Sequence, residues 1–550
     1  MNENPSIFND VIGPVMRGPS SSHTAASWRI AKTSIAILNE PLKKAIVDFD
    51  KGCIWATNFR EQGTVMGING GLLGIEMTDS LMKETERIAE EKDISIIYEI
   101  NSFPTKHTNT VRLFLEGING KSIQIVAASL GGGSFEIQKI NDFDVNIKGD
   151  YYELLTQSKI KEFTIDEVKL NLPENIIYNR HPAENGSLIN LKSSNMFPDE
   201  IISYYVDDFN FDEVIIIKPI LPIVSGNESE MPFNHIGTLI KYAEVENLDL
   251  GDIGIIYEKC LSGLSNSILI NKMNEIVTII EKSIEKGLQG TAYEDRILQQ
   301  QSHLIEKAEK AEKIPRNSLI NKIVANVSAI MESKSAMELI VANPTAGSCG
   351  AVGGVIKAVA DNLNSTNDEK VKAYFAAGIV GAYFAKGPGF SAEEYGCQVE
   401  CGAASGMAAA GLALLFGGSA KQSIDAACIA VQNMIGLVCD PIADRVEAPC
   451  LGKNITAAVN ALSSATMACS GFDAVIPFDE VLDTVSNVGK QMPNCLKNTG
   501  RGGLAITPTA IKLRGESAGQ RGSGVGGQRS GVRSQRSGDK QRENGKTEEH

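Results

Sequence analysis

SAEEYGCQVECGAASGMAAAG at residues 391–411 and LVCDPIADRVEAPCLG at residues 437–452 place three cysteines, Cys397, Cys439 and Cys450, among runs of small residues. Small side chains let helices pack closely, so these runs predict a dense helical domain around the cysteines. A proline directly precedes Cys450, and another follows Cys439 two residues later. Proline fixes φ and disfavours helix just before it, so both thiols should lie on rigid loops that point toward one place.

Three thiolates suit a soft metal, and an iron–sulfur cube needs four ligands. With only three protein ligands, one iron would stay open to a substrate, as one position stays open on a catalytic zinc. The spacing also fits three free buried cysteines, because no two of them form a CxxC pair. Cys401, four residues after Cys397, is either a further ligand or part of the core.

The whole chain predicts an α+β protein with four parts. Residues 1–135 form a small α/β domain, residues 136–244 a connector or insertion, residues 245–510 a mostly α-helical domain with the cysteines, and residues 511–550 a disordered tail. Composition predicts the tail, because residues 512–550 contain 9 basic and 5 acidic residues, many Gly, Ser and Gln, and no aromatic residue.

Hydrophobic periodicity and turn residues place the elements of these parts. The N-terminal domain should contain strands at residues 45–50, 53–59, 95–100, 110–117 and 122–130, and helices at residues 25–38 and 78–92. In the connector, FDEVIIIKPILPIV at residues 211–224 reads as a strand interrupted by prolines, which suits a sheet edge or an extended connector. From residue 235 onward, long amphipathic helices are expected, for example at residues 265–288 and 318–336.

A loop rich in hydroxyl groups, RGPSSSHT at residues 17–24, precedes the first predicted helix. Free N–H groups and hydroxyls at a helix start bind anions, so the loop is a candidate cradle for a carboxylate. Alternatively, one serine caps the helix and the others lie on the surface. The histidine can accept or donate a proton near neutral pH, or it simply forms hydrogen bonds at the helix start. The candidate residues are Ser20, Ser21, Ser22, His23 and Thr24.

A second loop of this kind, NPTAGSCG at residues 343–350, precedes another helical pattern. Its small residues allow close approach to a ligand, and Thr345, Gly347 and Ser348 could bind an amino acid through N–H and hydroxyl groups. One such loop is a weak signal. Two of them in different domains suggest a site between the domains, where pockets commonly form.

Six motifs resemble, in this order, those of the iron–sulfur L-serine dehydratases. They are GPSSSHT (18–24), NPTAGSCG (343–350), EYGCQVE (394–400), CDP (439–441), APC (448–450) and TGRGGLA (499–505). The resemblance covers roughly residues 10–135 and 245–508, with the β domain before the α domain in a single chain.

This resemblance implies a lyase that converts L-serine to pyruvate and ammonia. It implies that Cys397, Cys439 and Cys450 hold a four-iron, four-sulfur cluster with one open iron, and it places His23 in the active site as the candidate base. The open iron would bind the C3 hydroxyl of the substrate and help it leave. The sequence offers no candidate for the Schiff-base lysine and phosphate loop that a pyridoxal enzyme needs.

Two positions depart from the family pattern. Family members commonly carry GHGTD where this chain has EQGTV, so Gln62 replaces a histidine. An amide can bind a substrate but cannot take its proton. His107 lies in KHTNT, where the family has HPNT, and it is either a site residue or a loop histidine. L-cysteine, L-threonine or another β-substituted amino acid therefore remains an alternative substrate.

The overall composition indicates which partners to expect. A net charge of −15 argues against nucleic acid and anionic membranes, so we expect a small-molecule amino acid as the ligand. The start of the chain is polar, no run of 18 apolar residues occurs, and ten irregularly spaced cysteines do not suggest a disulfide framework, so a cytoplasmic protein is expected. An apolar bundle surface suggests a homodimer. An electron carrier with a fully ligated cluster, or a binding protein without iron, are the competing functions.

Overall fold

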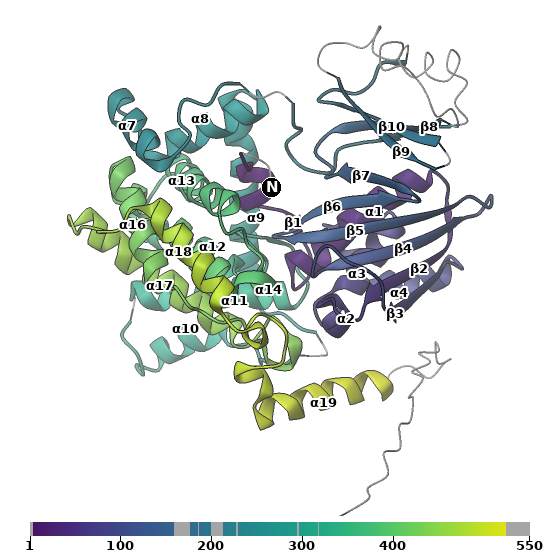
Figure 1. Cartoon of the computed structure of the whole chain (residues 1–550). Coiled ribbons are helices and arrows are strands. Elements are labelled where there is room, and N and C mark those ends of the chain that lie inside the picture. Colours follow the sequence, from purple (N-terminus) through teal and green to yellow (C-terminus); the bar gives the residue numbers. More distant parts are fainter. Residues whose placement is uncertain are drawn as a thin grey trace, which may run out of the picture.

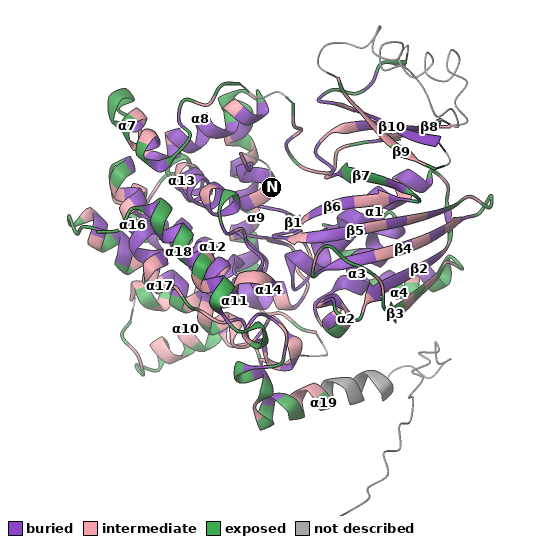
Figure 2. Ribbon diagram, viewed as in Figure 1, coloured by how far each residue is buried: buried purple, intermediate pink, exposed green. Residues whose placement is uncertain are grey.

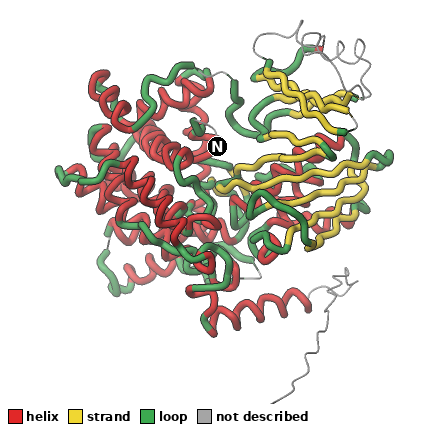
Figure 3. Tube along the Cα trace, in the orientation of Figure 1, coloured by secondary structure: helices red, strands yellow, loops and turns green. Residues whose placement is uncertain are grey.

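The computed structural model describes residues 4–158, 176–199 except 185, 213–226, 229–293, 296–316 and 318–523. Strands gather with the first helices on one side of the protein, and the later helices form the other side (Figure 1, Figure 3). Buried residues line the inner faces of both halves (Figure 2). The α+β prediction is confirmed.

The N-terminal half contains a six-stranded sheet in the order β3-β2-β4-β5-β6-β7, in which only β2 and β3 are parallel. Its strands are β2 (Leu42–Asp50), β3 (Ser95–Asn101), β4 (Thr110–Gly117), β5 (Ser122–Gly131), β6 (Ser134–Ile140) and β7 (Phe143–Ile147). Helices α1 (Ala26–Leu38) and α3 (Thr64–Leu72) pack on each other, and α1 contacts the sheet (Figure 1). The alternating burial of β4 and β5 reflects their alternating apolar sequence.

The prediction of a strand at residues 53–59 is wrong. The segment forms a turn and a short helix, α2 (Trp55–Asn58). Trp55 is fully buried and packs edge to face on Phe49, so the indole anchors the turn below the end of β2. The helix at residues 78–92 divides into a 3-10 turn, Ser80–Glu84, and α4 (Thr85–Glu91).

The predicted connector contains a second sheet of four antiparallel strands. These are β8 (Tyr152–Ser158), β9 (Ile177–Ala183), β10 (Gly186–Ser193) and β11 (Val214–Ile217). Their order in the sheet is β11-β8-β10-β9. The strand before the prolines, β11, lies at an edge, as predicted.

Helix α15 (Cys401–Leu415) is the centre of the helical half, and every residue from Cys401 to Ala413 is buried. It packs against α12 (Cys349–Leu363), α13 (Asn367–Lys386), α16 (Ala420–Gln432) and α17 (Cys450–Cys469). A side chain at Gly411 would come within 2.8 Å of the Ala373 carbonyl, so the small residues are what permits this spacing. Among the described residues, only Cys397–Leu415 is long and apolar enough to cross a membrane, and 83% of that window is buried within the protein, as in a core helix.

Further helices surround this centre. They are α7 (Ile236–Glu246), α8 (Leu250–Ser262), α9 (Asn266–Gln289), α10 (Ser302–Lys310), α11 (Leu319–Ser335), α14 (Ala392–Tyr395), α18 (Phe478–Gln491) and α19 (Pro508–Ser523). The last helix contradicts predicted disorder at residues 511–523. It is anchored by buried Ala510 and by Arg514, which pairs with Asp444. The remaining tail, residues 524–550, lies outside the described residues.

The N-terminal segment belongs to the helical half in space. A short π-helical turn, η1 (Ile7–Val11), packs against α13 (Figure 1). Ser6 Oγ and the Ile7 N–H donate to the buried Glu258 carboxylate, at 2.5 and 2.7 Å. Strand β1 (Val15–Met16) then pairs with β12 (Ile340–Val341), which brings the two hydroxyl loops together.

Candidate active site

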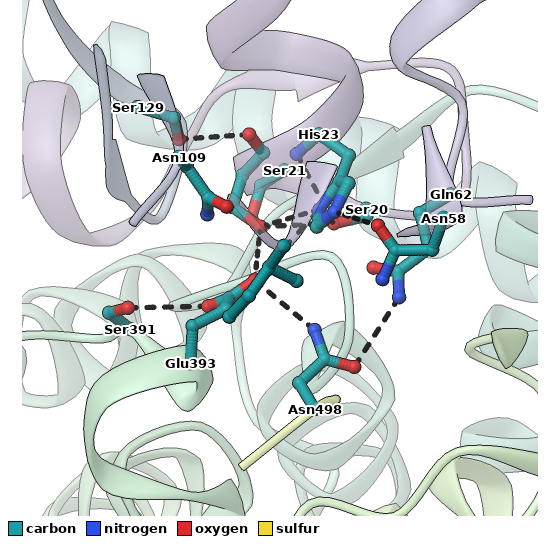
Figure 4. Close-up of polar contacts among 12 residues, drawn as sticks. Ser20, Ser21, His23, Asn58, Gln62, Asn109, Ser129, Ser391, Glu393 and Asn498 are labelled. Atoms are coloured by element: carbon teal, nitrogen blue, oxygen red, sulfur yellow. Dashed lines mark hydrogen bonds and ion pairs between the residues drawn. The ribbon is translucent and has the colours of Figure 1, made fainter. Parts of the chain in front are cut away.

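The two hydroxyl loops meet between the sheet and the helices. The first forms a π-helical turn, η2 (Ser21–Ala25), directly before α1. Ser21 Oγ accepts a hydrogen bond of 3.2 Å from the N–H of Ala346 in the second loop. The Ser129 hydroxyl of β5 donates to the Ser22 carbonyl at 2.8 Å (Figure 4). The predicted interdomain location of these two loops is what the structure shows.

His23 is fully buried at the centre of this region (Figure 4). Its Nε2 lies 2.9 Å from Asn58 Oδ1, and its Nδ1 lies 3.0 Å from Ser22 Oγ and 3.2 Å from Ser20 Oγ. Burial lowers the pKa of His23, although the Glu393 carboxylate and Asn58 act in the opposite direction. The imidazole is therefore neutral near pH 7, with one nitrogen free to accept a proton.

Glu393 of α14 links the two halves of the site (Figure 4). Its Oε1 accepts from the Ser22 hydroxyl at 3.4 Å and lies 3.9 Å from His23 Nδ1. Asn498 Nδ2 donates to the same oxygen at 3.1 Å, and the Ser391 hydroxyl donates to Oε2 at 3.2 Å. Ser391 precedes α14 but makes no side-chain cap, because its hydroxyl donates to Glu393 instead.

Gln62 lies on the far side of Asn498. It is buried, and its Nε2 donates to Asn498 Oδ1 at 3.3 Å, so it connects to the Glu393 carboxylate through one residue. The Thr24 hydroxyl donates to the Gln62 backbone carbonyl at 3.1 Å and so holds the loop. A substrate role for Gln62 and Thr24 stays a prediction.

His107 lies at the margin of this network. Its Nε2 is 3.4 Å from Glu394 Oε1, and its Nδ1 accepts from the Asn109 N–H at 3.1 Å. The His107 hydrogen bond is the main reason why the pKa of Glu394 is lowered. His107, in the sheet domain, therefore faces Glu394, in the helical domain. Its predicted role in substrate binding stays a prediction.

The second loop borders the cysteine region through Glu400. The Thr345 hydroxyl donates to Glu400 Oε1 at 2.8 Å and lies 3.1 Å from Ser348 Oγ. A Cβ atom at Gly347 would lie 3.0 Å from Glu400 Oε1, so the absence of a side chain at this position leaves room for the Glu400 carboxylate. Burial, followed by the negative charges of Cys397 and Glu393, raises the pKa of Glu400 to about 8.

Asn343 begins the second loop with an unsatisfied side chain. It is fully buried, and among the described residues neither its Oδ1 nor its Nδ2 has a hydrogen-bond partner. An unpaired buried amide is costly, so such a group commonly awaits a ligand or an ordered water.

The predicted metal ligands gather beneath these loops. Cys397 begins a 3-10 turn, Cys397–Val399, Cys439 lies in an extended segment paired with Lys497, and Cys450 begins α17. Cys450 is thus at a helix N-terminus rather than in a loop. Burial raises the pKa of both Cys439 and Cys450, and the charge of Cys397 raises each further, so the thiols lie close enough to interact.

Cys401 and Lys453 complete the surroundings of the thiols. A hydrogen bond from Cys401 is the main reason why the pKa of Cys397 is lowered to about 7, and Lys453 contributes. Lys453 Nζ donates to Asp440 Oδ1 and to the Val438 carbonyl, both at 2.7 Å, which holds its charge beside the cysteines.

This donor set fits an iron–sulfur cluster. It consists of interacting, largely buried thiols with one lysine beside them, and soft thiolates are the ligands of such clusters. Among the described residues, no three His, Cys, Asp or Glu side chains close around a single ion. That is compatible with a cluster, because ligands spread around a cube lie farther apart than ligands of one ion.

Several residues of this arrangement were not singled out from the sequence. Four of them are Asn58, Glu393, Glu400 and Asn498. The two glutamates flank Cys397 in the segment SAEEYGCQVE, so their proximity to a candidate ligand was an available signal. The two asparagines carry no such signal, because only the folded chain brings them to His23 and Glu393.

Comparison with known proteins gives a consistent result. The profile of the family described as "Serine dehydratase alpha chain" matches residues 167–505, a range that begins within the predicted connector. A "Probable L-serine dehydratase, alpha chain" of Bacillus subtilis (strain 168) is 36% identical over 281 residues, which are 51% of this chain and 94% of that protein.

Two further relatives match shorter ranges. A "Probable L-serine dehydratase, alpha chain" of Latilactobacillus sakei is 40% identical over 197 residues, which are 36% of this chain and 94% of that protein. "L-serine dehydratase 1" of Escherichia coli (strain K12) is 40% identical over 180 residues, which are 32% of this chain and 40% of that protein.

Proposed function

Because the chain belongs to the serine dehydratase alpha chain family, we propose that it is an L-serine ammonia-lyase, which converts L-serine to pyruvate and ammonia. The supporting observation is that three segments distant in the sequence form one buried site. Ser22 and Glu393 join the first hydroxyl loop to the segment before Cys397, and Thr345 and Glu400 join the second loop to the segment after it.

Cys397, Cys439 and Cys450 would hold a four-iron, four-sulfur cluster. When bound, a cluster with an open iron supplies a Lewis acid that makes the substrate hydroxyl a better leaving group. Lys453 offsets the negative charge that the thiolates bring into this buried region. Cys401 supports Cys397 by hydrogen bonding.

The second loop would hold the amino acid. The unpaired Asn343 amide and the hydroxyls of Thr345 and Ser348 offer donors and acceptors for the substrate carboxylate and amine. His23 then takes the Cα proton, which needs a neutral imidazole, and burial keeps it neutral.

The elimination of water from L-serine breaks two bonds and forms one new π bond. The Cα–H pair becomes the new Cα–Cβ π bond while the Cβ–O bond breaks, and the proton and the hydroxide together make water. The 2-aminoacrylate product tautomerises to an imine, and one water hydrolyses it to pyruvate and ammonia.

Anaerobic purification tests this function. We expect about four iron and four sulfide per chain and pyruvate formation from L-serine. Cys397→Ser, Cys439→Ser and Cys450→Ser should each lose the iron and the activity. Cys495→Ser is the matched control, because Cys495 is exposed, and it should keep both. Iron-free protein, or iron-loaded protein that forms no pyruvate from any amino acid, would refute the proposal.

Gln62 favours a second candidate, a lyase for another β-substituted amino acid. It replaces the family histidine and donates to Asn498, so the shape and polarity of the site near the substrate differ. Measuring turnover of L-serine, L-threonine and L-cysteine side by side decides between the two. If kcat/KM is highest for L-threonine or L-cysteine, that amino acid and not L-serine is the preferred substrate.

A further inference from the structure

Glu393 is a buried carboxylate that the proposed reaction does not yet use. It is 7% exposed, and its four polar neighbours come from both halves of the protein (Figure 4). Burying a carboxylate costs free energy unless the charge is paired, so the position of Glu393 beside His23 suggests a functional role.

The contacts of His23 define which nitrogen can accept a proton. Asn58 presents its amide oxygen to Nε2 at 2.9 Å, and an amide oxygen only accepts hydrogen bonds. Nε2 therefore carries the hydrogen in the neutral ring. The lone pair is then on Nδ1, on the side of Ser20, Ser22 and Glu393.

The hydroxyl groups satisfy both protonation states of the ring. In the neutral state, the Ser20 hydroxyl, 3.2 Å away, can donate to Nδ1. Once Nδ1 is protonated, it can donate to Ser22 Oγ at 3.0 Å, and the Ser22 hydroxyl already donates to Glu393 Oε1 at 3.4 Å. The positive ring and the negative carboxylate would then be joined through one hydroxyl.

Asn498 and Ser391 fix the carboxylate in this position. Asn498 donates to the oxygen nearest His23, and Ser391 donates to the other oxygen. Gln62 in turn donates to Asn498. Gln62 does not titrate, so the opposite charge for a protonated His23 comes from Glu393. Two further carboxylates lie near Glu393: Glu394 pairs with His107, and Glu400 lies on the side of the cysteines.

We propose that Glu393 is a positioning residue that stabilises His23 after Nδ1 has taken the substrate Cα proton, and that Asn58 fixes the tautomer that leaves Nδ1 free. This inference rests on the proposed lyase function. The proton moves from Cα to the Nδ1 lone pair, the Cα–H electron pair enters the new C–C double bond, and Glu393 takes no part in covalent change.

The tautomer can be measured in the full-length, cluster-loaded protein labelled with 15N at histidine. The His23 signals are identified by their loss in His23→Gln. We expect wild-type protein to carry the hydrogen on Nε2, and Asn58→Ala to give a mixture of both tautomers. Hydrogen on Nδ1 in the wild-type protein would overturn the assignment.

Steady-state kinetics tests the role of Glu393. Glu393→Gln keeps the size and removes the charge, so kcat should fall roughly 100-fold while KM changes less than about 3-fold. Glu393→Asp should recover part of kcat. The control is Glu480→Gln, an exposed carboxylate on α18, the helix that packs against α14, and it should match the wild type. Iron content and melting temperature of all variants are compared to exclude loss of folding.

The outcomes separate this inference from the lyase function. If wild-type protein turns over serine and Glu393→Gln keeps its kcat, the inference is wrong and the lyase function stands. If wild-type protein and Glu480→Gln both form no pyruvate, the lyase function fails, and the tautomer measurement still decides the assignment of Asn58.

Discussion

At the residue scale, the role of Cys401 determines whether the proposed cluster has three or four cysteine ligands. It is buried, it begins α15, and Asn454 Nδ2 lies 3.7 Å from its sulfur. Its hydrogen bond with Cys397 raises the pKa of Cys401 well above the ordinary value, whereas the same bond lowers that of Cys397 to about 7. We therefore expect the thiolate on Cys397, with Cys401 as a thiol beside it.

Cys401→Ser should accordingly keep its iron and most of its activity. A serine hydroxyl can still donate to Cys397, so we expect iron content within error of the wild type and kcat reduced less than about 5-fold. Iron and sulfide analysis after anaerobic purification, with Cys397→Ser as the iron-free reference, measures this. Loss of iron in Cys401→Ser would identify Cys401 as a fourth ligand. A cluster with four protein ligands has no open iron, so electron transfer would then be the better-supported function.

Single residues were predictable where the sequence itself places them near a chemical group. The prolines beside Cys439 and Cys450 indicated fixed thiols, and the structure brings these to Cys397. The partners of His23 were not predictable, because Asn58 lies 35 residues away and its segment was read as a strand.

At the scale of elements, hydrophobic periodicity predicted most helices and strands, because an element that is buried on one face repeats apolar residues at a regular spacing. It predicted α1, α9, β4 and β5 within a few residues. It failed where an anchor side chain decides, as with Trp55 in α2 and with Ala510 and Arg514 in α19. It did not indicate that η1, five residues long, would pack against α13 beside Glu258 of α8.

Glu258 in α8 holds this N-terminal turn and should make its docking depend on pH. Burial raises the pKa of Glu258 from 4.5 to about 7, against hydrogen bonds from Ser6 and Ile7. Between these values the unfolded chain loses a proton that the folded chain keeps, so stability falls as pH rises from about 5 to 8. The shift corresponds to roughly 3 kcal/mol in the free energy of unfolding.

Glu258→Gln should remove this contribution. Urea unfolding followed by circular dichroism at pH 5 and pH 8 measures it, and the variant should gain stability relative to the wild type at the higher pH. Glu275→Gln, an exposed carboxylate on α9, is the control and should leave the pH dependence unchanged. Stability that falls as steeply between pH 5 and pH 8 in Glu258→Gln as in the wild type would show that Glu258 does not contribute to the pH dependence.

At the scale of the whole molecule, the two halves depend on each other. The N-terminal segment passes through the helical half before the sheet begins, and β1 pairs with β12. The site is made where Ser21 meets Ala346 and Ser22 meets Glu393, so neither half carries it alone. A predicted homodimer, a cytoplasmic location and the absence of nucleic acid and membrane partners stay predictions.

The chain should therefore tolerate a break between the halves. We expect residues 1–226 and 227–550, expressed together, to copurify and to keep serine turnover within about tenfold of the intact chain, because a linker mainly raises effective concentration. Each piece alone should be inactive. The matched control starts the first piece at residue 17, which removes η1 and β1 but keeps the hydroxyl loop. That piece should no longer copurify, since the bonds to Glu258 and the pairing with β12 are lost. If the shortened piece binds as well as the full one, the N-terminal segment does not join the halves, and the contacts around His23 and Glu393 must hold them together.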